Sequence, residues 1–404
     1  MLFIYTITIN FYTFHNIYKE IDNLRFWRFI ILIYEIKKLN IMNTLIAYKF
    51  RLKPNKNQIQ YFSECFGNSR FLWNEMLEDT EKYFKETGKF LNIKSYKKYK
   101  RDFMNSLDST LCNNVLRYFR QSYKNFFNSG FGKPRFKSKK DSRDSYTSNN
   151  INDSIKIKGN FIRLPKIGYV KAKIHKPLDK EDIIKNATVS KDPDGKYYIS
   201  LICETSRDYT LEPNTNSIGI DLGIQYLYTD SNGNKVENPK FLKKSLKKIK
   251  FLQKSISRKK KNSRNYEKAK IKLAKEHTKV KNRRKDYLNK ISKQLINENQ
   301  VICLESLSPK DICSSKKSNN NFRRAAGDAG LGMFISMLVY KAKLYGRTIK
   351  TVDKYFPSSQ VCSSCGSLHP EMKNLGNKQL VCIDCGTIID RDYNAAINIL
   401  KNAK

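Results

Sequence analysis

The chain has 404 residues, of which 40% are hydrophobic and 12% are aromatic; this excludes a disordered chain and gives room for two or three domains. Its 78 lysine and arginine residues oppose only 37 aspartate and glutamate residues, so the formal charge is +41. Positive charges at this density repel one another unless a polyanion neutralises part of them, and nucleic acid is the usual polyanion. We therefore expect a nucleic-acid-binding protein. A merely soluble basic protein and a membrane-surface binder are the weaker alternatives.

Residues 1–41 differ from the rest of the chain because they show neither helical nor strand periodicity and have no turn punctuation by glycine or proline. Their apolar run, 29–34, is too short to span a bilayer and has no cleavage site, so we expect no export signal and no membrane partner. We interpret residues 1–41 as an upstream extension or artefact and expect translation to start at Met42. A genuine N-terminal hairpin is the alternative.

Strand, helix and loop patterns follow one another after Met42. Residues 43–52 alternate in polarity before Pro54, which predicts a strand. Residues 55–128 carry apolar side chains at helical spacing, which predicts helices. The loop Gly130–Lys140 combines cations with aromatic residues, a composition that pairs with phosphates and stacks on bases. Its candidate nucleic-acid-binding residues are Lys133, Arg135 and Lys137, and a solvated linker is the alternative.

The period becomes two again between Ile155 and Glu204. A hairpin is predicted around the turn Asp192–Gly195. Its second strand places Tyr197, Ile199, Leu201 and Cys203 on one face. Together with the strand at 43–52, we expect these strands to form a small barrel or sheet into which the helices of 55–128 are inserted.

Residues 241–296 are predicted to form two long basic helices. Between Lys243 and Lys293 there are 22 lysine or arginine residues and three acids. A solvated helix face usually mixes the two signs for i,i+4 pairing, so this near absence of acids favours a surface for nucleic acid. The candidate contacts are Arg258, Lys259, Lys260, Arg283 and Arg284.

The C-terminal half alternates between predicted strands and helices. These are a strand-turn-strand unit at 218–230, the basic helices, a buried strand at 301–304, a helix at about 328–344, a strand at 347–352 and a final helix that begins near Asn394. This order fits an RNase H-like α/β fold.

Four of the nine cysteines form two pairs near the C-terminus, with sixteen residues between the pairs. They are Cys362 and Cys365, then Cys382 and Cys385. The spacing predicts a structural zinc ion with four thiolate ligands. Two redox-active pairs or two disulfides are the alternatives, which the lack of thioredoxin-like surroundings disfavours. Thiols that bind a metal also indicate a reducing compartment, which is the cytoplasm, close to the nucleoid, if the host is prokaryotic.

Acidic residues are rare in this chain, and several stand at predicted strand ends or helix starts. Asp221 and Glu305 end apolar strands, and Asp390 and Asp392 precede the last helix. Clustered carboxylates are tolerated only where cations neutralise them, and hard oxygen ligands suit Mg²⁺ or Mn²⁺. The sequence thus predicts a two-metal centre that hydrolyses a phosphodiester. Taken singly, each acid is also compatible with a turn, a capping role or a helix N-cap.

Several stretches resemble the TnpB (OrfB) proteins of insertion sequences, which are related to type V CRISPR effectors and to Fanzor proteins. The C-terminal ones are Gly219–Gly223, Leu304–Leu307, Tyr355–Gly366 and Asp390–Leu400, and the N-terminal ones are Asn43–Pro54, Arg70–Asn74 and the Gly-Lys-Pro-Arg-Phe-Lys loop. The resemblance covers about residue 42 to the end.

The resemblance implies an RNA-guided DNA endonuclease, in which base pairing reads the sequence and the protein reads shape and backbone. Its partners would be a guide RNA from the element end and a double-stranded DNA target. The implied domains are a recognition region, 42–210, with a β-barrel wedge (42–54 and 145–210) and a helical lobe (55–144), and a RuvC-like nuclease, 211–404, with basic helices (241–296) and a zinc ribbon (357–389).

The RuvC acids of the family match Asp221, Glu305 and an acid just before the last helix. We favour Asp392 over Asp390 because two small alanines follow it one helical turn later, which would let the helix approach the metal site closely. Asp390 would then be a ribbon-exit residue or an outer-shell partner of the metal site.

Two other functions would use the same features. A nuclease-inactive regulator or accessory of transposition would use the basic helices and the ribbon only to bind nucleic acid. A transposase that joins DNA strands would use the same two-metal chemistry, but it also needs recognition of element ends by an ordered oligomer. The intact acids favour the endonuclease.

Overall fold

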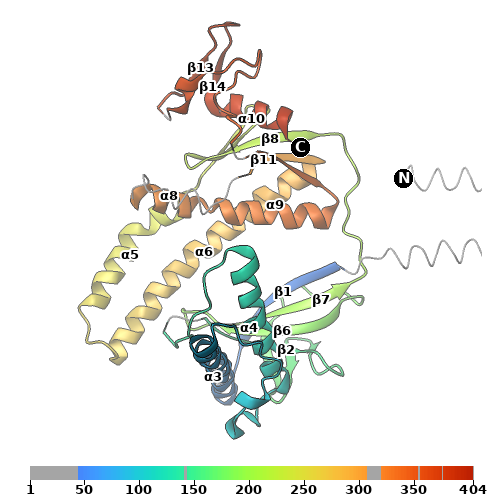
Figure 1. Ribbon diagram of the computed structural model, residues 1–404, viewed down its shortest axis with the longest axis vertical. Helices are drawn as coiled ribbons and strands as arrows, with labels where there is room; N and C mark the ends of the chain where they lie inside the picture. The colour runs from blue at the N-terminus through green and yellow to red at the C-terminus, as the bar shows by residue number, and fades with distance from the viewer. Residues whose placement is uncertain (1–43, 141–142, 307–319, 354, 375, 404) are drawn as a thin grey trace, which may run out of the picture.

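Figure 1 shows the computed structural model of the chain, which describes residues 44–140, 143–306, 320–353, 355–374 and 376–403. One module is built on a seven-stranded sheet and the other on a five-stranded sheet. The extension or hairpin expected at residues 1–41 and the expected start at Met42 lie outside the described residues.

The seven-stranded sheet is antiparallel and has the order β2-β6-β7-β1-β5-β4-β3. Its strands are β1 (Thr44–Lys53), β2 (Asp144–Asn149), β3 (Lys156–Lys158), β4 (Phe161–Leu164), β5 (Gly168–Lys173), β6 (Ile183–Lys191) and β7 (Tyr197–Thr205). Among the described residues β2 and β3 are the two edges. Backbone hydrogen bonds therefore do not close the sheet, so of the expected small barrel or sheet the open sheet forms, and it is more open than the β-barrel wedge that the resemblance implied.

Strand β1 lies in the middle of this sheet and has the predicted alternation. Tyr48, Phe50 and Leu52 are buried, while the residues between them are exposed. Strand β7 alternates in the same way, with Tyr197, Ile199, Leu201 and Cys203 buried. The predicted turn also forms, because the Gly195 N–H donates to the Asp192 carbonyl at 2.9 Å. The period of two in the sequence thus identified both strands correctly.

Two helices are inserted between β1 and β2, as predicted. They are α3 (Lys56–Thr87) and α4 (Ser109–Ser129), with the short turns η1 (Lys97–Tyr99) and η2 (Asp102–Met104) between them. Helix α3 begins with a capping box, in which the side chains of Asn55 and Gln58 accept hydrogen bonds from each other's backbone N–H groups. Both helices end at a glycine with positive φ, Gly88 and Gly130.

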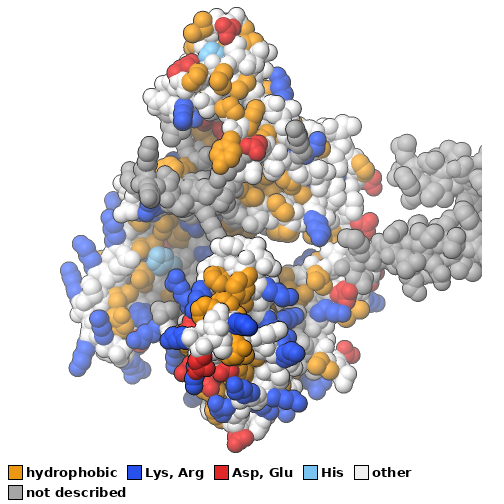
Figure 2. Space-filling model, viewed as in Figure 1, with side chains coloured by type: hydrophobic (Ala, Val, Ile, Leu, Met, Phe, Trp, Pro, Cys, Tyr) orange, Lys and Arg blue, Asp and Glu red, His pale blue; other side chains and the backbone are white. Residues whose placement is uncertain are grey.

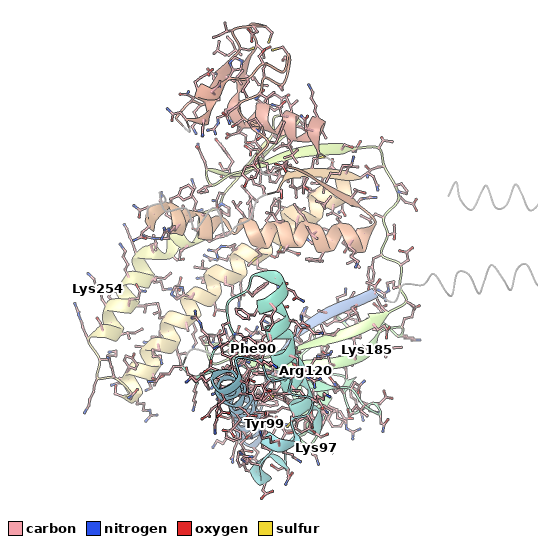
Figure 3. The ribbon with its side chains drawn as sticks, in the orientation of Figure 1. Phe90, Lys97, Tyr99, Arg120, Lys185 and Lys254 are labelled. Carbon is pink, nitrogen blue, oxygen red and sulfur yellow. The ribbon has the colours of Figure 1, made fainter. Side chains whose placement is uncertain are left out.

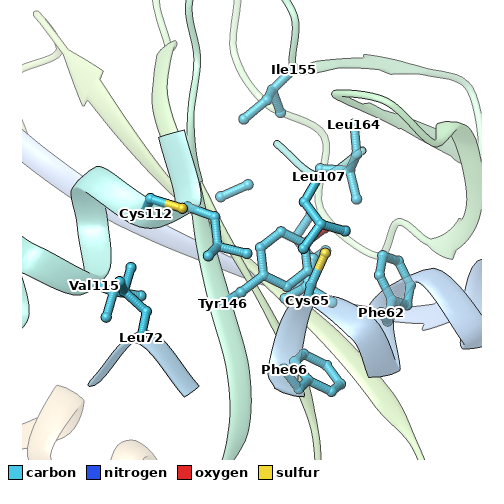
Figure 4. Close-up of a cluster of buried hydrophobic side chains, with 14 of the residues drawn as sticks. Phe62, Cys65, Phe66, Leu72, Leu107, Cys112, Val115, Tyr146, Ile155 and Leu164 are labelled. Carbon is cyan, nitrogen blue, oxygen red and sulfur yellow. The ribbon is translucent and has the colours of Figure 1, made fainter. Parts of the chain in front are cut away.

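The two helices and the sheet share one hydrophobic core, shown in Figure 4. Tyr146 of β2 packs against Phe62 and Phe66 of α3, with ring centroids 6.1 and 6.0 Å apart. Cys112 of α4 is buried in the same cluster. The inserted helices are therefore part of the same folding unit as the sheet.

The five-stranded sheet has the order β10-β9-β8-β11-β12. The strands β8 (Ser217–Leu222), β11 (Val301–Glu305) and β12 (Thr348–Val352) are parallel, and β9 (Tyr226–Asp230) and β10 (Lys235–Glu237) run antiparallel to their neighbours. Helices cover both faces: Ile302 and Leu304 of β11 share a core with α6 (Arg264–Glu298) and α9 (Leu331–Tyr345), whereas Cys303 packs with Ile399 of α10 (Arg391–Asn402). This module is mixed α/β, as predicted.

Two helix boundaries differ from the predicted ones. The helix expected at about 328–344 is α9, which begins at Leu331; the residues before it form a separate, unpredicted helix, α8 (Asn320–Ala329), and Gly330 at φ 71° lies between the two. A Cβ at Gly330 would meet the Arg284 side chain of α6 at 2.9 Å, so the glycine also permits this close contact. The final helix starts earlier than predicted, at Arg391, because Asp390 caps it.

The predicted basic helices are α5 (Phe241–Ser257) and α6, which pack side by side (Figure 1). Ile249 is the buried residue of α5. In Figure 2, Lys and Arg side chains line the outer edge of this helix pair. None of the helices within the described ranges is long and apolar enough to cross a membrane.

Candidate functional site

Asp221 and Glu305 lie side by side at the carboxyl ends of two parallel strands. In the pairing of β8 with β11, Ile220 lies opposite Leu304, so the next residue of each strand is a predicted acid. Ile220 and Leu304 are buried toward α6 and α9. Because side chains alternate along a strand, Asp221 and Glu305 point to the other face, which α10 covers.

Helix α10 brings the third predicted acid to this face. Asp392 lies in its first turn, and Ala396, one turn later, is buried against β8. The contact is so close that a Cβ on Gly219 would lie 2.2 Å from the Ala396 carbonyl oxygen. Small residues on both sides therefore let the helix approach the strand that carries Asp221, as the sequence predicted.

Asp221 is surrounded by like charge. Burial raises its pKa well above the ordinary value, and the Glu305 and Asp392 carboxylates raise it further. The three carboxylates do not close into a compact ligand set. Among the described residues, only the four ribbon cysteines and the group of His369, Cys382 and Asp384 have potential ligand atoms all within 4.8 Å of one another. The Asp221, Glu305 and Asp392 carboxylates are thus close enough to repel one another, but their oxygen atoms do not all lie within the distance expected of ligands to one metal ion.

Asp390 has other partners. Its Oδ1 accepts hydrogen bonds from the N–H groups of Asp392 and Tyr393, each at 3.1 Å, and its Oδ2 lies 2.7 Å from Lys235 Nζ. Burial alone would raise its pKa, but Lys235 and the two N–H groups hold the pKa of Asp390 below its ordinary value. Asp390 is therefore a charged N-cap, and Asp392 raises the pKa of Asp221 more than Asp390 does. The choice of Asp392 as the third site acid stays a prediction.

The segment that enters the ribbon also contacts the acids. Ser358 Oγ donates to Glu305 Oε1 at 2.5 Å, and Asn398 Nδ2 of α10 donates to the Ser358 carbonyl at 2.8 Å. Asn394 of α10 accepts from the Ser363 N–H at 2.8 Å. Sequence reasoning missed Ser358, Asn394 and Asn398. Two asparagines inside a helix were the available signal, because asparagine is disfavoured there unless its side chain has a specific partner.

The four predicted zinc ligands come together in a ribbon built on β13 (Gln379–Val381), β14 (Ile388–Asp390) and the turn η3 (Pro370–Lys373). Cys362 Sγ lies 3.7 Å from Cys385 Sγ, and Cys365 Sγ lies 3.5 Å from Cys382 Sγ. Tetrahedral zinc with Zn–S bonds of about 2.3 Å would place the sulfurs about 3.8 Å apart. All four are free thiols, which argues against two disulfides.

Each cysteine pair is built in the same way. In the first pair, Gly366 has a φ of 86°, and its N–H donates to the Cys362 carbonyl. Ser367 Oγ lies 3.1 Å from Cys365 Sγ, and the Ser367 hydroxyl and N–H lower the pKa of Cys365 to about 6, which favours the thiolate that zinc needs. The second pair repeats this arrangement with Cys382, Cys385, Gly386 and Thr387.

The cationic loop at 130–140 is tied to α3. Trp73 Nε1 donates to the Arg135 carbonyl at 3.0 Å, and Lys137 Nζ lies 3.4 Å from the centroid of the Trp73 ring. Burial lowers the pKa of Lys137 to about 8. Lys133 pairs with Glu81 at 3.1 Å. Lys133 and Lys137 thus have partners within the lobe, and their contact with nucleic acid stays a prediction.

The candidate cations of the basic helices differ in their surroundings. Arg258, Lys259 and Lys260 lie in the turn between α5 and α6, and Arg283 is exposed on α6. Arg284 is largely buried, and its guanidinium donates to Asp328 at 2.8 Å. Asp328 also accepts from the N–H groups of Leu242 and Lys243 at the start of α5. Arg284 therefore joins α5, α6 and α8, a structural role beside the predicted nucleic-acid contact.

Family models match three regions of the chain. Residues 200–316 match the model of OrfB from IS605 elements, described as "Probable transposase". Residues 332–399 match the Cas12f1-like TNB domain. Residues 42–89 match a helix-turn-helix domain of OrfB, although in this structure the described part of that region is strand β1 and the single helix α3.

Relatives match over most of the chain. A Streptomyces pristinaespiralis protein, "Putative RNA-guided DNA endonuclease", is 33% identical over 368 residues, which cover 88% of each chain. The Escherichia coli (strain K12) protein "Putative RNA-guided DNA endonuclease InsQ" is 28% identical over 380 residues, which cover 89% of this chain and 92% of the other. A cryo-EM structure of a Cas12f1-sgRNA-target DNA complex has a TM-score of 0.54 and 15% identity over 85% of this chain and 83% of that chain, so the fold is shared.

Proposed function

The chain belongs to the TnpB (OrfB) family, and on that basis we propose that it is an RNA-guided DNA endonuclease of a transposable element that uses divalent metal ions. The observation that carries the proposal is the placement of Asp221, Glu305 and Asp392 on one face of the five-stranded sheet. Carboxylates in this arrangement are suited to phosphodiester hydrolysis.

The sheet itself supports a RuvC-like, RNase H-like nuclease module. The sheet consists of the parallel strands β8, β11 and β12 and, beside β8, the strands β9 and β10, each antiparallel to its neighbour. Asp221 lies near the carboxyl end of β8 and Glu305 at the carboxyl end of β11. In open α/β sheets, functional sites form at the carboxyl ends of the parallel strands.

The three acids fit Mg²⁺ or Mn²⁺, because carboxylate oxygens are the ligands that these ions prefer. The raised pKa of Asp221 indicates that its negative charge lacks sufficient compensation from the protein. When bound, such ions activate a water molecule and stabilise the leaving oxygen of the phosphodiester. Ser358 orients Glu305 through its hydrogen bond. Asp390 fixes the first turn of α10 and so positions Asp392.

The ribbon would hold a structural zinc ion, because four thiolates leave no open coordination position. The ribbon would contribute to the nuclease by holding other residues in place. Asn394 and Asn398 donate hydrogen bonds to the carbonyls of Ser358 and Val361, and Asn394 accepts one from the Ser363 N–H, which joins α10 to this segment. A folded ribbon therefore restrains the helix that carries Asp392 and the serine that orients Glu305.

The proposed partners are a guide RNA and a double-stranded DNA target. The relatives named above as RNA-guided DNA endonucleases support this, as does the formal charge of +41. The exposed cations Arg258, Lys260 and Arg283 on and beside the basic helices are suited to phosphate contacts.

The experiment is to express the full chain with the DNA that flanks its gene, sequence the RNA that co-purifies, and test cleavage of a DNA matching that RNA. We expect a discrete RNA, and cleavage that requires Mg²⁺ or Mn²⁺ and disappears in Asp221→Ala. RNA binding without cleavage by the unsubstituted chain would instead identify a nuclease-inactive binding protein. Joining of DNA ends would identify a transposase.

A matched pair of variants tests the choice of the third acid. Asp392→Asn removes the charge next to Asp221, so we expect cleavage to fall to background while stability changes little. Asp390→Asn keeps a good N-cap residue and loses only the pairing with Lys235, so we expect cleavage to persist. The reverse result would assign the metal to Asp390.

A further inference from the structure

A small pocket opens on the helical lobe, where the end of α3, the segment that follows it and the second half of α4 meet. Its volume is about 290 Å³. Phe90, Tyr123 and Phe127 contribute aromatic walls, and Arg120 also lines it; Figure 3 labels Phe90 and Arg120 on this part of the lobe. We call this site the aromatic pocket. It is separate from the three carboxylates and from the ribbon.

The rings of the aromatic pocket are clustered yet open to solvent. The ring centroid of Phe90 lies 4.8 Å from that of Phe127 and 5.7 Å from that of Tyr123. Phe90 is 36% exposed and Phe127 is 55% exposed. Large apolar rings that gather at the mouth of a pocket mark a binding surface, and their flat faces suit a planar ligand.

One polar atom of the aromatic pocket has no partner. Tyr123 Oη is buried and makes no hydrogen bond with any of the residues described. Burial raises the pKa of Tyr123 to about 12, so at neutral pH the hydroxyl keeps its proton and can donate or accept. A buried hydroxyl without a partner is unfavourable. A ligand whose hydrogen-bonding edge reaches this hydroxyl would therefore be stabilised.

The rim of the aromatic pocket is cationic. Arg120 Nε donates to the Ile93 carbonyl at 2.8 Å, which holds the guanidinium beside the pocket. Lys124 also lines it, and the lining includes no aspartate or glutamate. Aromatic faces next to cations are the combination with which proteins hold single-stranded nucleic acid, by stacking bases and pairing phosphates.

We propose that the aromatic pocket binds one unpaired base of a nucleic-acid strand. The base stacks on Phe127, the more exposed of the two rings, and its edge forms a hydrogen bond with Tyr123 Oη. Phe90, whose ring stands at 82° to that of Phe127, contacts the edge of the base. Arg120 and Lys124 pair with the adjacent phosphate. A base within a duplex does not fit, because its faces are stacked on its neighbours and its pairing edge is occupied. The inference rests on the proposed function in so far as that function brings nucleic acid to the chain.

Binding of defined oligonucleotides tests this inference. The probes are single-stranded RNA and single-stranded DNA of one sequence, each with a 2-aminopurine, and the corresponding duplex. The protein is the full chain, freed of bound nucleic acid at high salt and assayed without Mg²⁺. The variants are Phe90→Ala, Phe127→Leu and Tyr123→Phe. Phe127→Leu keeps an apolar side chain and so separates the loss of stacking from any loss of folding. Phe161→Ala is the control, because Phe161 is also exposed but lies on β4.

We expect Phe127→Leu to weaken single-strand binding roughly tenfold, as the loss of a stacked base does, and Phe90→Ala to weaken it less, because Phe90 contacts only the edge of the base. Quenching of 2-aminopurine should fall in parallel, while duplex binding and the Phe161→Ala control stay unchanged. Tyr123→Phe should change the preference among bases more than the overall affinity. If the loss occurs with RNA alone or with DNA alone, that strand is the occupant.

Equal losses for single strand and duplex, or no loss with unchanged quenching, would overturn the inference. The result is independent of cleavage. If these variants bind normally while Asp221→Ala abolishes cleavage, the aromatic pocket is not a base site and the proposed endonuclease stands. If the unsubstituted chain binds none of the probes, the inference fails, and the proposed function is still tested separately by the co-purifying RNA and by cleavage.

Discussion

At the scale of single residues, Gly219 determines where Asp392 lies, because α10 rests on it. In Gly219→Ala the new Cβ would lie 2.2 Å from the Ala396 carbonyl oxygen and 2.7 Å from the Leu400 nitrogen, and neither backbone atom can rotate away. We expect a loss of about 1–3 kcal/mol in the free energy of unfolding, as for overpacked cores. Cleavage should fall as well, because α10 must move from β8. Thermal unfolding and cleavage assays measure both effects.

Gly67→Ala is the control for this substitution. Gly67 lies within α3, and a Cβ there has no neighbour within 4 Å. Alanine in a helix is more stable than glycine by about 0.5–1 kcal/mol, so this variant should be slightly more stable and fully active. If Gly219→Ala behaved like Gly67→Ala, the close contact between α10 and β8 would not be needed.

The charge of Asp221 gives a pH dependence. Because the folded chain raises the pKa of Asp221 above its ordinary value of 3.8, the metal-free folded state binds more protons than the unfolded state above about pH 4. Stability from this group therefore falls as the pH rises. Without divalent ions, Asp221→Asn should raise the melting temperature at pH 7–8 and have little effect near pH 4. Added Mg²⁺ should stabilise the unsubstituted chain and not Asp221→Asn; equal shifts in both would show that Mg²⁺ acts elsewhere.

Local patterns in the sequence predicted the acids but not the residues that support them. Asp221 and Glu305 follow apolar strands, a signal contained in a few neighbouring residues. Ser358 and Lys235 contact acids that are 53 and 155 positions away in the chain. Such contacts depend on how distant segments pack, so spacing alone does not reveal them. Whether the three acids hold metal together stays a prediction.

At the scale of elements, the ribbon has too small a core to fold without its metal. Its buried hydrophobic cluster consists of Cys362, Met372, Leu380 and Cys382, two of which are proposed zinc ligands. Removal of zinc with a chelator, or Cys382→Ser, should unfold the ribbon. Asn394 and Asn398 of α10 would then lose their partners, so cleavage should fall too. Hydrogen exchange should increase in the ribbon and in α10 but not in α3 or α4.

Restoring the metal provides the control. Zn²⁺ should return both the protection of α10 and the cleavage, whereas Mg²⁺ alone should return neither. If the chelated protein kept α10 protected and cleaved DNA at the original rate, the ribbon would not position the nuclease acids.

Periodicity predicted most elements correctly, and it was wrong where a segment has few apolar side chains. The pairs α3 with α4 and α5 with α6, and the strands β1, β7, β8 and β11, lie close to their predicted positions. Helix α8 was missed because its ten residues are mostly polar or small, although Asp328 at its end pairs with Arg284 of α6. Similarly, the pattern of the N-terminal strands does not distinguish a closed barrel from the open sheet that forms.

At the scale of the whole molecule, the formal charge of +41 should make salt act in opposite directions on the free protein and on its complex. Self-repulsion destabilises a compact chain of high charge, and salt screens it. The melting temperature of the nucleic-acid-free protein should therefore rise between low and physiological salt.

A bound polyanion reverses this response. RNA should raise the melting temperature at low salt, because it binds the folded state preferentially, and this gain should shrink steeply as salt displaces it. Replacing Arg258, Lys259 and Lys260 with alanine should lower the slope of log affinity against log salt by up to about three, at about 0.7–0.9 for each phosphate that the protein no longer neutralises. An unchanged slope would mean that the turn between α5 and α6 does not contact the RNA backbone. Lysine and arginine residues elsewhere on the molecule would then bind the RNA phosphates.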